Sequence, residues 1–151
     1  MPKRIAAAAF GLVTVLGPAM AQSGAPAETA IRDALIKWAR DFNAGDTAEI
    51  CALFAPDLRY DYRGQPERGY DDICGLLHRS LSDRTKKYSY TLQIKEIVVS
   101  GDLAVVRLVW ALRVSSVGAA TEAVSEEPGM DIFRRQPDGR WKIIRYIAYE
   151  N

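Results

Sequence analysis

The chain has 151 residues, 26% of them charged, and a formal net charge of +1 at pH 7. This length favours a single domain with one apolar core. The near balance of basic and acidic residues gives no reason to expect binding to nucleic acid or to an anionic membrane surface. One histidine and two cysteines, without paired metal-ligand spacing, argue against a metal site, and we predict neither metal nor cofactor.

Residues 1–21 have the features of a secretory signal peptide. Lys3 and Arg4 precede an apolar run at 5–16, which at twelve residues is too short to span a bilayer. Residues 19–21, Ala-Met-Ala, fit a small-x-small cleavage site. We therefore predict cleavage after residue 21, a periplasmic or secreted mature protein, and no stable membrane anchor once the leader is removed.

The two cysteines, Cys51 and Cys74, remain after this cleavage. An oxidising compartment permits a disulfide between them, which would stabilise the fold by roughly 3 kcal/mol. The alternative is a pair of buried free thiols that behave as small apolar residues. The sequence leaves both possibilities open, with the disulfide as our prediction.

The helices are predicted near the start of the chain. A loose linker at 22–27 precedes a domain at 28–151, and apolar periodicity predicts helices at 28–43, 46–54 and 72–82. Apolar residues of the first helix recur at spacings of four, three and four, at Ile31, Leu35, Trp38 and Phe42. Asp46, followed by Glu49 three residues on, resembles a capping box for the second helix.

The rest of the chain is predicted to be mainly strands. Alternating or β-branched patterns predict strands at 58–62, 88–100, 103–115, 130–136 and 141–150. The segment 116–129 is predicted as a looser region whose glutamates form a solvated loop. Helices followed by antiparallel strands indicate an α+β domain.

Three motifs, taken in order, resemble a known superfamily. They are "DFNAGDTAEICALFAPD" (41–57), "YDYRG" (60–64) with "GYDDI" (69–73), and "DIFRRQPDGRWKIIRYIAYE" (131–150). Together they are similar to the nuclear-transport-factor-2-like superfamily, in its SnoaL-like and ketosteroid-isomerase-related branches. The resemblance implies a cone-shaped, curved antiparallel or mixed sheet wrapped around three N-terminal helices. It also implies an apolar pocket between sheet and helices, and frequent dimerisation.

The resemblance singles out Asp61 as a candidate general base. The isomerases place an aspartate at the end of the first strand, and Asp61 matches that position. A carboxylate at the mouth of an apolar cavity could remove a proton next to a carbonyl group. The alternative is a solvated strand residue that pairs with Arg59 or Arg63, worth about 0–1 kcal/mol.

Other residues are candidates for contact with a ligand. Trp38 stands where the isomerases carry a tyrosine, and Glu127 lies near their second acid position, with Asp131 a few residues later. The predicted substrate-binding residues are Trp38, Tyr60, Tyr62, Trp110 and Asp131.

Two functions remain open from the sequence. The first is an exported SnoaL-like domain that binds a small apolar or amphipathic molecule in its cone, with cofactor-free acid–base chemistry of the isomerase or lyase type. The second is a non-catalytic ligand-binding or dimerisation module. In either case we expect a small hydrophobic ligand and a homodimer formed through the sheet.

Overall fold

The computed structural model describes residues 24–118 and 120–149. In this part of the chain the elements are α1 (Ala25–Ala44), β1 (Phe54–Tyr62), β2 (Arg68–Gly69), α2 (Tyr70–Ser82), β3 (Lys86–Ser100), β4 (Leu103–Ser116), β5 (Glu122–Arg135) and β6 (Trp141–Ala148). The predicted signal peptide lies outside the described residues. The first helix begins at Ala25, inside the segment that we predicted as a linker.

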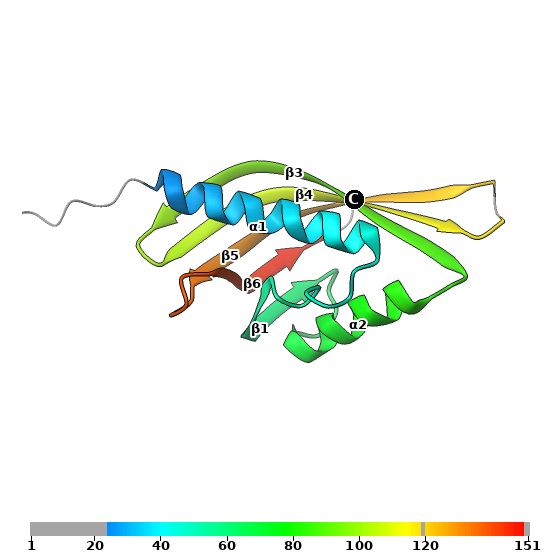
Figure 1. Cartoon of the computed structure of the whole chain (residues 1–151), viewed down its shortest axis with the longest axis horizontal. Coiled ribbons are helices and arrows are strands. Elements are labelled where there is room, and N and C mark those ends of the chain that lie inside the picture. Colours follow the sequence, from blue (N-terminus) through cyan, green and yellow to red (C-terminus); the bar gives the residue numbers. More distant parts are fainter. Residues whose placement is uncertain (1–23, 119, 150–151) are drawn as a thin grey trace, which may run out of the picture.

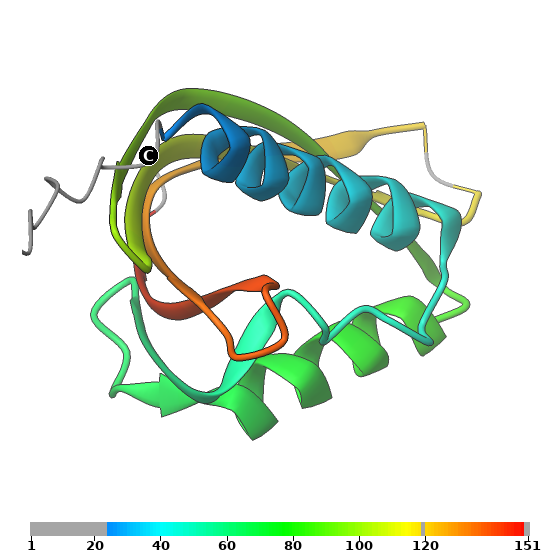
Figure 2. The same cartoon turned by 60° about the vertical axis from the view of Figure 1, so that its left-hand side comes forward.

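The strands form one curved mixed sheet in the order β2-β1-β6-β5-β4-β3. β1 and β6 are parallel, and every other neighbouring pair is antiparallel. The sheet curls around α1, while α2 lies across the opposite side of the opening (Figures 1 and 2). The predicted α+β class with a curved mixed sheet is therefore confirmed.

The helix α1 packs its apolar face into the curve of the sheet. Its buried apolar residues are the four that recur along one face of the sequence: Ile31, Leu35, Trp38 and Phe42. The helix ends at Gly45, whose φ of 72° is the left-handed conformation that glycine adopts without strain. The Gly45 N–H donates to the carbonyl oxygen of Phe42 at 2.9 Å and closes the last turn.

The predicted second helix at 46–54 is not present, so the described part of the chain has two helices rather than three. The Asp46 side chain accepts a hydrogen bond from the Ala48 N–H, two residues on, and forms a local turn instead of a helix cap. The carbonyl of Ile50 accepts the indole N–H of Trp38 at 2.9 Å. Backbone bonds within the segment are of the tighter i→i+3 kind, so these residues form successive turns that lead into β1.

The strand β5 starts earlier than the sequence pattern predicted. Residues that we placed in a solvated loop pair with β4 throughout, including Glu127 opposite Trp110 and Val124 opposite Arg113. An ion pair between Arg113 and Glu122 at 3.7 Å joins the ends of this extended hairpin. The polar residues of this segment have a weak intrinsic preference for strands, so the sequence pattern did not predict one. Pairing with the long neighbouring β4 compensates for that weak preference.

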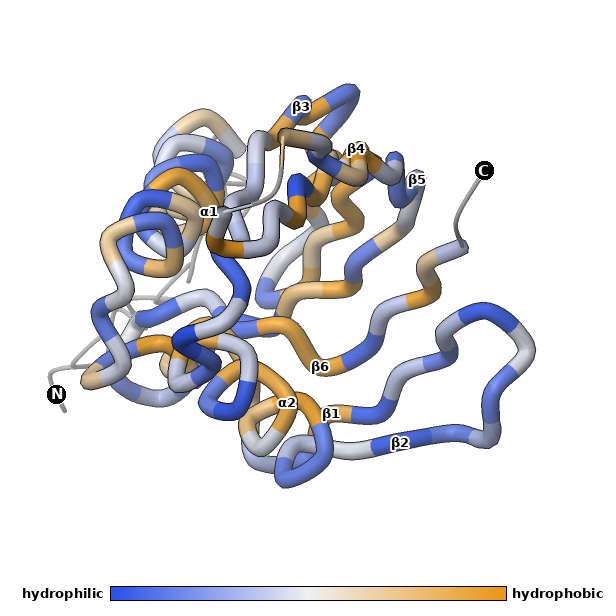
Figure 3. The backbone as a smooth tube through the Cα atoms, turned by 90° about the vertical axis from the view of Figure 1, so that its right-hand side faces the viewer, coloured by the Kyte–Doolittle hydropathy of each residue, from blue (hydrophilic) through white to orange (hydrophobic). Residues whose placement is uncertain are grey.

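The concave face of the sheet forms most of the core. Val106 and Phe133 are fully buried there, and Leu58 of β1 is 1% exposed. Hydrophobic stretches of β1, β6 and α2 lie beside one another in Figure 3. The interior beyond this core, toward the open end of the cone, is not completely filled.

Candidate functional site

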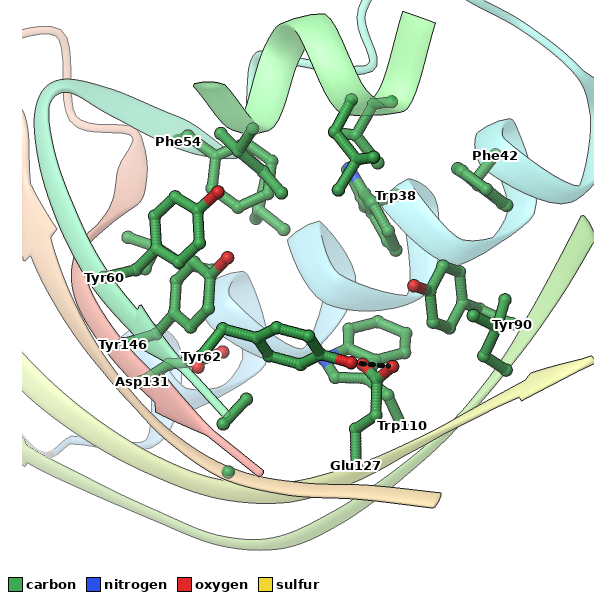
Figure 4. Close-up of a pocket in the computed structure, with 18 of the residues that line it drawn as sticks. Trp38, Phe42, Phe54, Tyr60, Tyr62, Tyr90, Trp110, Glu127, Asp131 and Tyr146 are labelled. Atoms are coloured by element: carbon green, nitrogen blue, oxygen red, sulfur yellow. Dashed lines mark hydrogen bonds between the residues drawn. The ribbon is translucent and has the colours of Figure 1, made fainter. Parts of the chain in front are cut away.

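A cavity of about 340 Å³ lies between the concave sheet face and the two helices. Aromatic side chains dominate its walls (Figure 4). The Trp38 ring lies 5.4 Å from that of Phe42, 5.6 Å from Tyr90 and 5.2 Å from Trp110, measured between ring centroids. These contacts make one continuous aromatic wall, suited to a flat apolar molecule.

The polar group of Trp38 is not available to a ligand. Its indole N–H is committed to the carbonyl oxygen of Ile50, at 2.9 Å in a buried position. Trp38 thus lines the cavity, as does Trp110, but it contributes an aromatic face and no free donor. A hydrogen-bond donor for a bound molecule must therefore come from other residues.

The sheet register places a row of polar side chains across the floor of the cavity. Tyr60 of β1 pairs with Tyr146 of β6, and Tyr146 pairs with Asp131 of β5. Directly paired residues of neighbouring strands point to the same face of a sheet. All three side chains consequently line the cavity, as Figure 4 shows.

Asp131 is the acid of this row, and it is deeply buried. Only 5% of the residue is exposed, and among the described residues it has neither a hydrogen bond nor an ion pair. Burial raises its pKa from 3.8 to about 7, because a charged carboxylate loses its hydration in an apolar surrounding. The group can therefore hold or release a proton near neutral pH.

The rings of Tyr60 and Tyr146 are stacked, with centroids 4.4 Å apart and planes within 14° of parallel. The Tyr60 hydroxyl is buried and has no hydrogen-bond partner in the described part of the chain. Burial raises the pKa of Tyr146, and the neighbouring Tyr60 and Asp131 raise it further. The Tyr146 hydroxyl consequently stays protonated and can act as a donor.

A second polar pair lies nearer the open end of the cavity. The Tyr62 hydroxyl donates to Glu127 at 3.0 Å. Burial, with the charge of Glu127, raises the pKa of Tyr62 to about 12, while burial also raises the pKa of Glu127 against the opposing effect of the Tyr62 hydrogen bond. The Tyr62 ring can reach across β6 because the facing residues are small, Ala148 and Gly129.

Asp61 lies outside the cavity. Its neighbours Tyr60 and Tyr62 point inward, so strand alternation turns Asp61 to the opposite, solvent-exposed face. It pairs there with Ile147, which is 57% exposed. We expected this side chain to face the cavity, and the structure corrects that orientation. As a candidate base, Asp61 has no enclosed volume in which to act.

Cys51 and Cys74 form a disulfide, with their Cα atoms 5.6 Å apart. The alternative of two free thiols does not hold. The bond ties the turns before β1 to α2, and α2 contributes Ile73 and Leu77 to the cavity wall. The disulfide thus helps to fix the helix side of the cavity relative to the sheet.

Within residues 24–118 and 120–149, no group of three or more His, Cys, Asp or Glu side chains is arranged to hold a metal ion. In the same ranges neither helix combines the length and the apolar character needed to cross a membrane.

The comparisons with known proteins agree with this architecture. The family model for the SnoaL-like domain matches residues 35–144, more than half of the chain, and the chain belongs to that family. None of the curated proteins compared with it matches.

Solved structures with a similar fold come from several bacteria. A conserved protein from Planctomyces limnophilus is 22% identical with a TM-score of 0.73, covering 84% of this chain and 98% of its own. A ketosteroid isomerase-like protein from Erwinia carotovora atroseptica is 22% identical with a TM-score of 0.65, covering 81% and 94%. An NTF2-like protein with a cystatin-like fold from Novosphingobium aromaticivorans has the same identity and TM-score, covering 82% and 80%. At these identities the likeness establishes the fold alone.

The sequence singled out only part of this site. Trp38, Tyr60, Tyr62, Trp110 and Asp131 all line the cavity. Tyr146 and Tyr90 were missed, and Glu127 was placed in a solvated loop. Strand alternation places Tyr90 on the same face as Leu92, which pairs with Trp110 of β4. Nothing in the sequence marked that face as a cavity wall.

Proposed function

We propose that the chain binds a small apolar or amphipathic molecule in its cone and catalyses cofactor-free proton transfer on it. The observation that carries the proposal is the isolated Asp131 carboxyl on the floor of an aromatic cavity. Its pKa of about 7 makes it useful both as a base and as an acid near neutral pH. We assign the role of proton carrier to Asp131 rather than to the exposed Asp61.

The chemistry that suits this arrangement is proton abstraction next to a carbonyl group. The Asp131 carboxylate would take a proton from the adjacent carbon, and the electron pair of the C–H bond would move onto the carbonyl as an enolate. Return of the proton to another carbon would give isomerisation, and expulsion of a β-hydroxyl group by the enolate, with the proton passing from Asp131 to the leaving oxygen, would release water and give dehydration. Hydroxyl donors close to the enolate oxygen would lower the barrier for both reactions.

The test uses 2-acetylnaphthalene, a flat aromatic ketone with exchangeable methyl protons. We expect the protein to accelerate exchange of these protons for deuterium in D₂O at neutral pD, with saturation, as followed by proton NMR. Asp131→Asn should slow the exchange by about 100-fold or more, the usual contribution of a general base. Asp61→Asn is the matched control and should exchange at the wild-type rate.

Two results would count against the proposal. Equal exchange by wild type and Asp131→Asn would remove Asp131 from the chemistry. Saturable binding without any exchange would leave a non-catalytic ligand-binding module, the second function considered from the sequence.

We also propose a homodimer formed through the outer face of the sheet. Exposed apolar residues meet there: Met130 pairs with Ile147, and Val105 pairs with Val98 on the neighbouring strand. The ion pair Arg107–Glu96 lies beside the patch, so two copies related by a two-fold axis could pair opposite charges across it. Met130→Glu should shift a dimer to monomer in sedimentation analysis, and a monomeric wild type would refute the assignment.

Export to a periplasmic or extracellular compartment is a third part of the proposal. The Cys51–Cys74 disulfide is compatible with an oxidising compartment. Intact-mass measurement on protein from its own host should find a chain that begins after residue 21. A mass that retains the leader would contradict export by cleavage.

A further inference from the structure

The outer part of the cavity contains a carboxylate among aromatic rings. Glu127 of β5 is directly paired with Trp110 of β4, so both side chains leave the sheet on the same face. The Tyr62 hydroxyl donates to Glu127 Oε1 at 3.0 Å, and Figure 4 shows the three side chains together at the edge of the cavity. In the described part of the chain this is the only hydrogen bond of the Glu127 carboxylate. Its other oxygen is therefore open to a bound molecule.

Aromatic rings continue from this carboxylate along the cavity wall. The Trp110 ring lies 5.6 Å from Tyr90 and 5.2 Å from Trp38, measured between centroids, and both pairs are T-shaped. A T-shaped pair directs the edge of one ring at the face of the other, so the ring faces of this cluster point in different directions. The charge of Glu127 adds to the effect of burial in raising the pKa of Tyr90, which places the carboxylate close to that ring as well. Ring faces and a carboxylate both attract a cation.

The charges around Glu127 leave its carboxylate only partly compensated. Burial raises the pKa of Glu127 against the opposing effects of the Tyr62 hydrogen bond and the charge of Arg63, a residue that lies over the Tyr62 ring at 5.4 Å from its centroid. Arg68 is the basic residue among those that line the described cavity. It belongs to β2, and β1 and β6 separate that strand from β5. A bound cation would complete the compensation, and a position near the open end would let it keep part of its hydration.

We propose that Glu127, with the rings of Trp110 and Tyr90, forms a subsite for the alkylammonium group of a cationic amphipathic ligand. The apolar body of this ligand would lie deeper in the cavity, against Trp38. This inference rests on the proposed use of the cavity as a ligand site, and it narrows the amphipathic class to molecules that carry a positive charge. The role of Glu127 is to bind the cation, whereas proton transfer is assigned to Asp131.

The experiment compares three naphthalenes that differ in one substituent. (2-Naphthylmethyl)trimethylammonium carries the cation, 2-neopentylnaphthalene replaces its nitrogen by carbon, and 2-naphthylmethanesulfonate carries an anion. Affinities are measured by equilibrium dialysis for wild type, Glu127→Gln, Trp110→Leu and a control, Glu126→Gln. The glutamine at 127 keeps the shape of the side chain and can still accept the Tyr62 hydrogen bond. The control removes the same charge from the neighbouring residue, which is exposed on the opposite face of β5.

We expect wild type to bind the ammonium compound about threefold or more tightly than its neutral isostere, and the sulfonate most weakly. Glu127→Gln should lower the ammonium-to-hydrocarbon affinity ratio by about five- to tenfold, because it removes the charge and leaves the apolar contacts in place. Trp110→Leu should lower the same ratio by about threefold through loss of an aromatic face. Glu126→Gln should leave the ratio at the wild-type value.

The possible failures are distinguishable. The same ratio in wild type and Glu127→Gln would overturn the cation subsite while leaving the proposed ligand site intact. An equal fall of the ratio in Glu126→Gln and Glu127→Gln would show a general effect of surface charge and would also overturn the subsite. A wild-type preference for the hydrocarbon or the sulfonate would overturn the cationic class of ligand. Absence of binding by all three compounds would overturn the subsite, and the proposed function would fall with it only if 2-acetylnaphthalene neither bound nor exchanged its protons.

Discussion

Replacement of Asp131 by asparagine tests the electrostatic basis of the site through folding stability. The asparagine side chain has nearly the same shape but cannot ionise. The folded-state pKa of about 7, against an ordinary 3.8, reflects burial of the carboxyl group. Because burial disfavours the charged form, Asp131 ionises more easily in the unfolded chain than in the folded protein. This difference lowers the free energy of unfolding of wild type as the pH rises, and the asparagine variant is free of that effect.

The magnitude follows from the two pKa values. Below about pH 4 the carboxyl is protonated in both the folded and unfolded states and has no effect. Between the two pKa values the unfolded state is ionised while the folded state keeps its proton, so the destabilisation grows as the pH rises, at about 1.4 kcal/mol per pH unit. It reaches roughly 2 kcal/mol at pH 5 and levels off near 4 kcal/mol above pH 7.

The assay is urea unfolding followed by tryptophan fluorescence at pH 5, 6, 7 and 8. We expect the stability of Asp131→Asn relative to wild type to increase by about 2–3 kcal/mol between pH 5 and pH 8. An unsatisfied hydrogen bond of the new amide would change the free energy of unfolding equally at all four pH values, so the dependence of the difference on pH would stay the same. Asp61→Asn, on the exposed face, should show a flat difference over the same range. A flat difference for Asp131→Asn as well would refute a buried, unpartnered carboxyl.

Three further changes test separate parts of the structure. Tyr60→Phe should raise the free energy of unfolding of the ligand-free protein by about 1 kcal/mol or more in urea titrations, because it removes a buried hydroxyl without a partner; a loss of stability would show that the hydroxyl is satisfied. Replacement of both Cys51 and Cys74 by serine should lower that free energy by about 3 kcal/mol. A reductant should lower the stability of wild type and leave that of the double variant unchanged, and a wild type that does not respond to the reductant would show that the bond does not form. Phe133→Ala, at a fully buried position, should cost about 3–5 kcal/mol by thermal unfolding, and a small effect would place the core elsewhere.

The parts of the fold that local chemistry determines could be predicted from the sequence. The apolar face of α1 and its glycine end are properties of a few neighbouring residues, and the long strands β3 and β4 are rich in β-branched residues. The predicted helix at 46–54 failed because distant residues decide that segment. Its Ile50 carbonyl bonds Trp38, and its Cys51 bonds Cys74, and neither partner is visible in local periodicity.

The candidate site depended on the strand faces, and these depend on bulges. In β6, Ile143 pairs with Phe133 while Arg145 pairs with Ile132, so Ile144 is an extra residue in the ladder. Simple alternation from Ile143 would turn Tyr146 to the solvent, and the extra residue returns it to the cavity beside Tyr60. A bulge is specified by the pairing of two strands rather than by the pattern of one.

The orientation of Asp61 was mispredicted because a sequence motif does not determine the face of a strand. Matching a motif gives a position along the strand, whereas chemistry depends on the face to which the side chain points. With Tyr60 and Tyr62 inward, no displacement smaller than a one-residue change of register could bring Asp61 into the cavity, and that change would expel both tyrosines. The acid on the cavity floor, Asp131, reaches it on β5, in a row whose other members come from β1 and β6. The arrangement of this site is thus a property of strand register across the sheet, and the pH dependence of the Asp131 variant measures whether that register is correct.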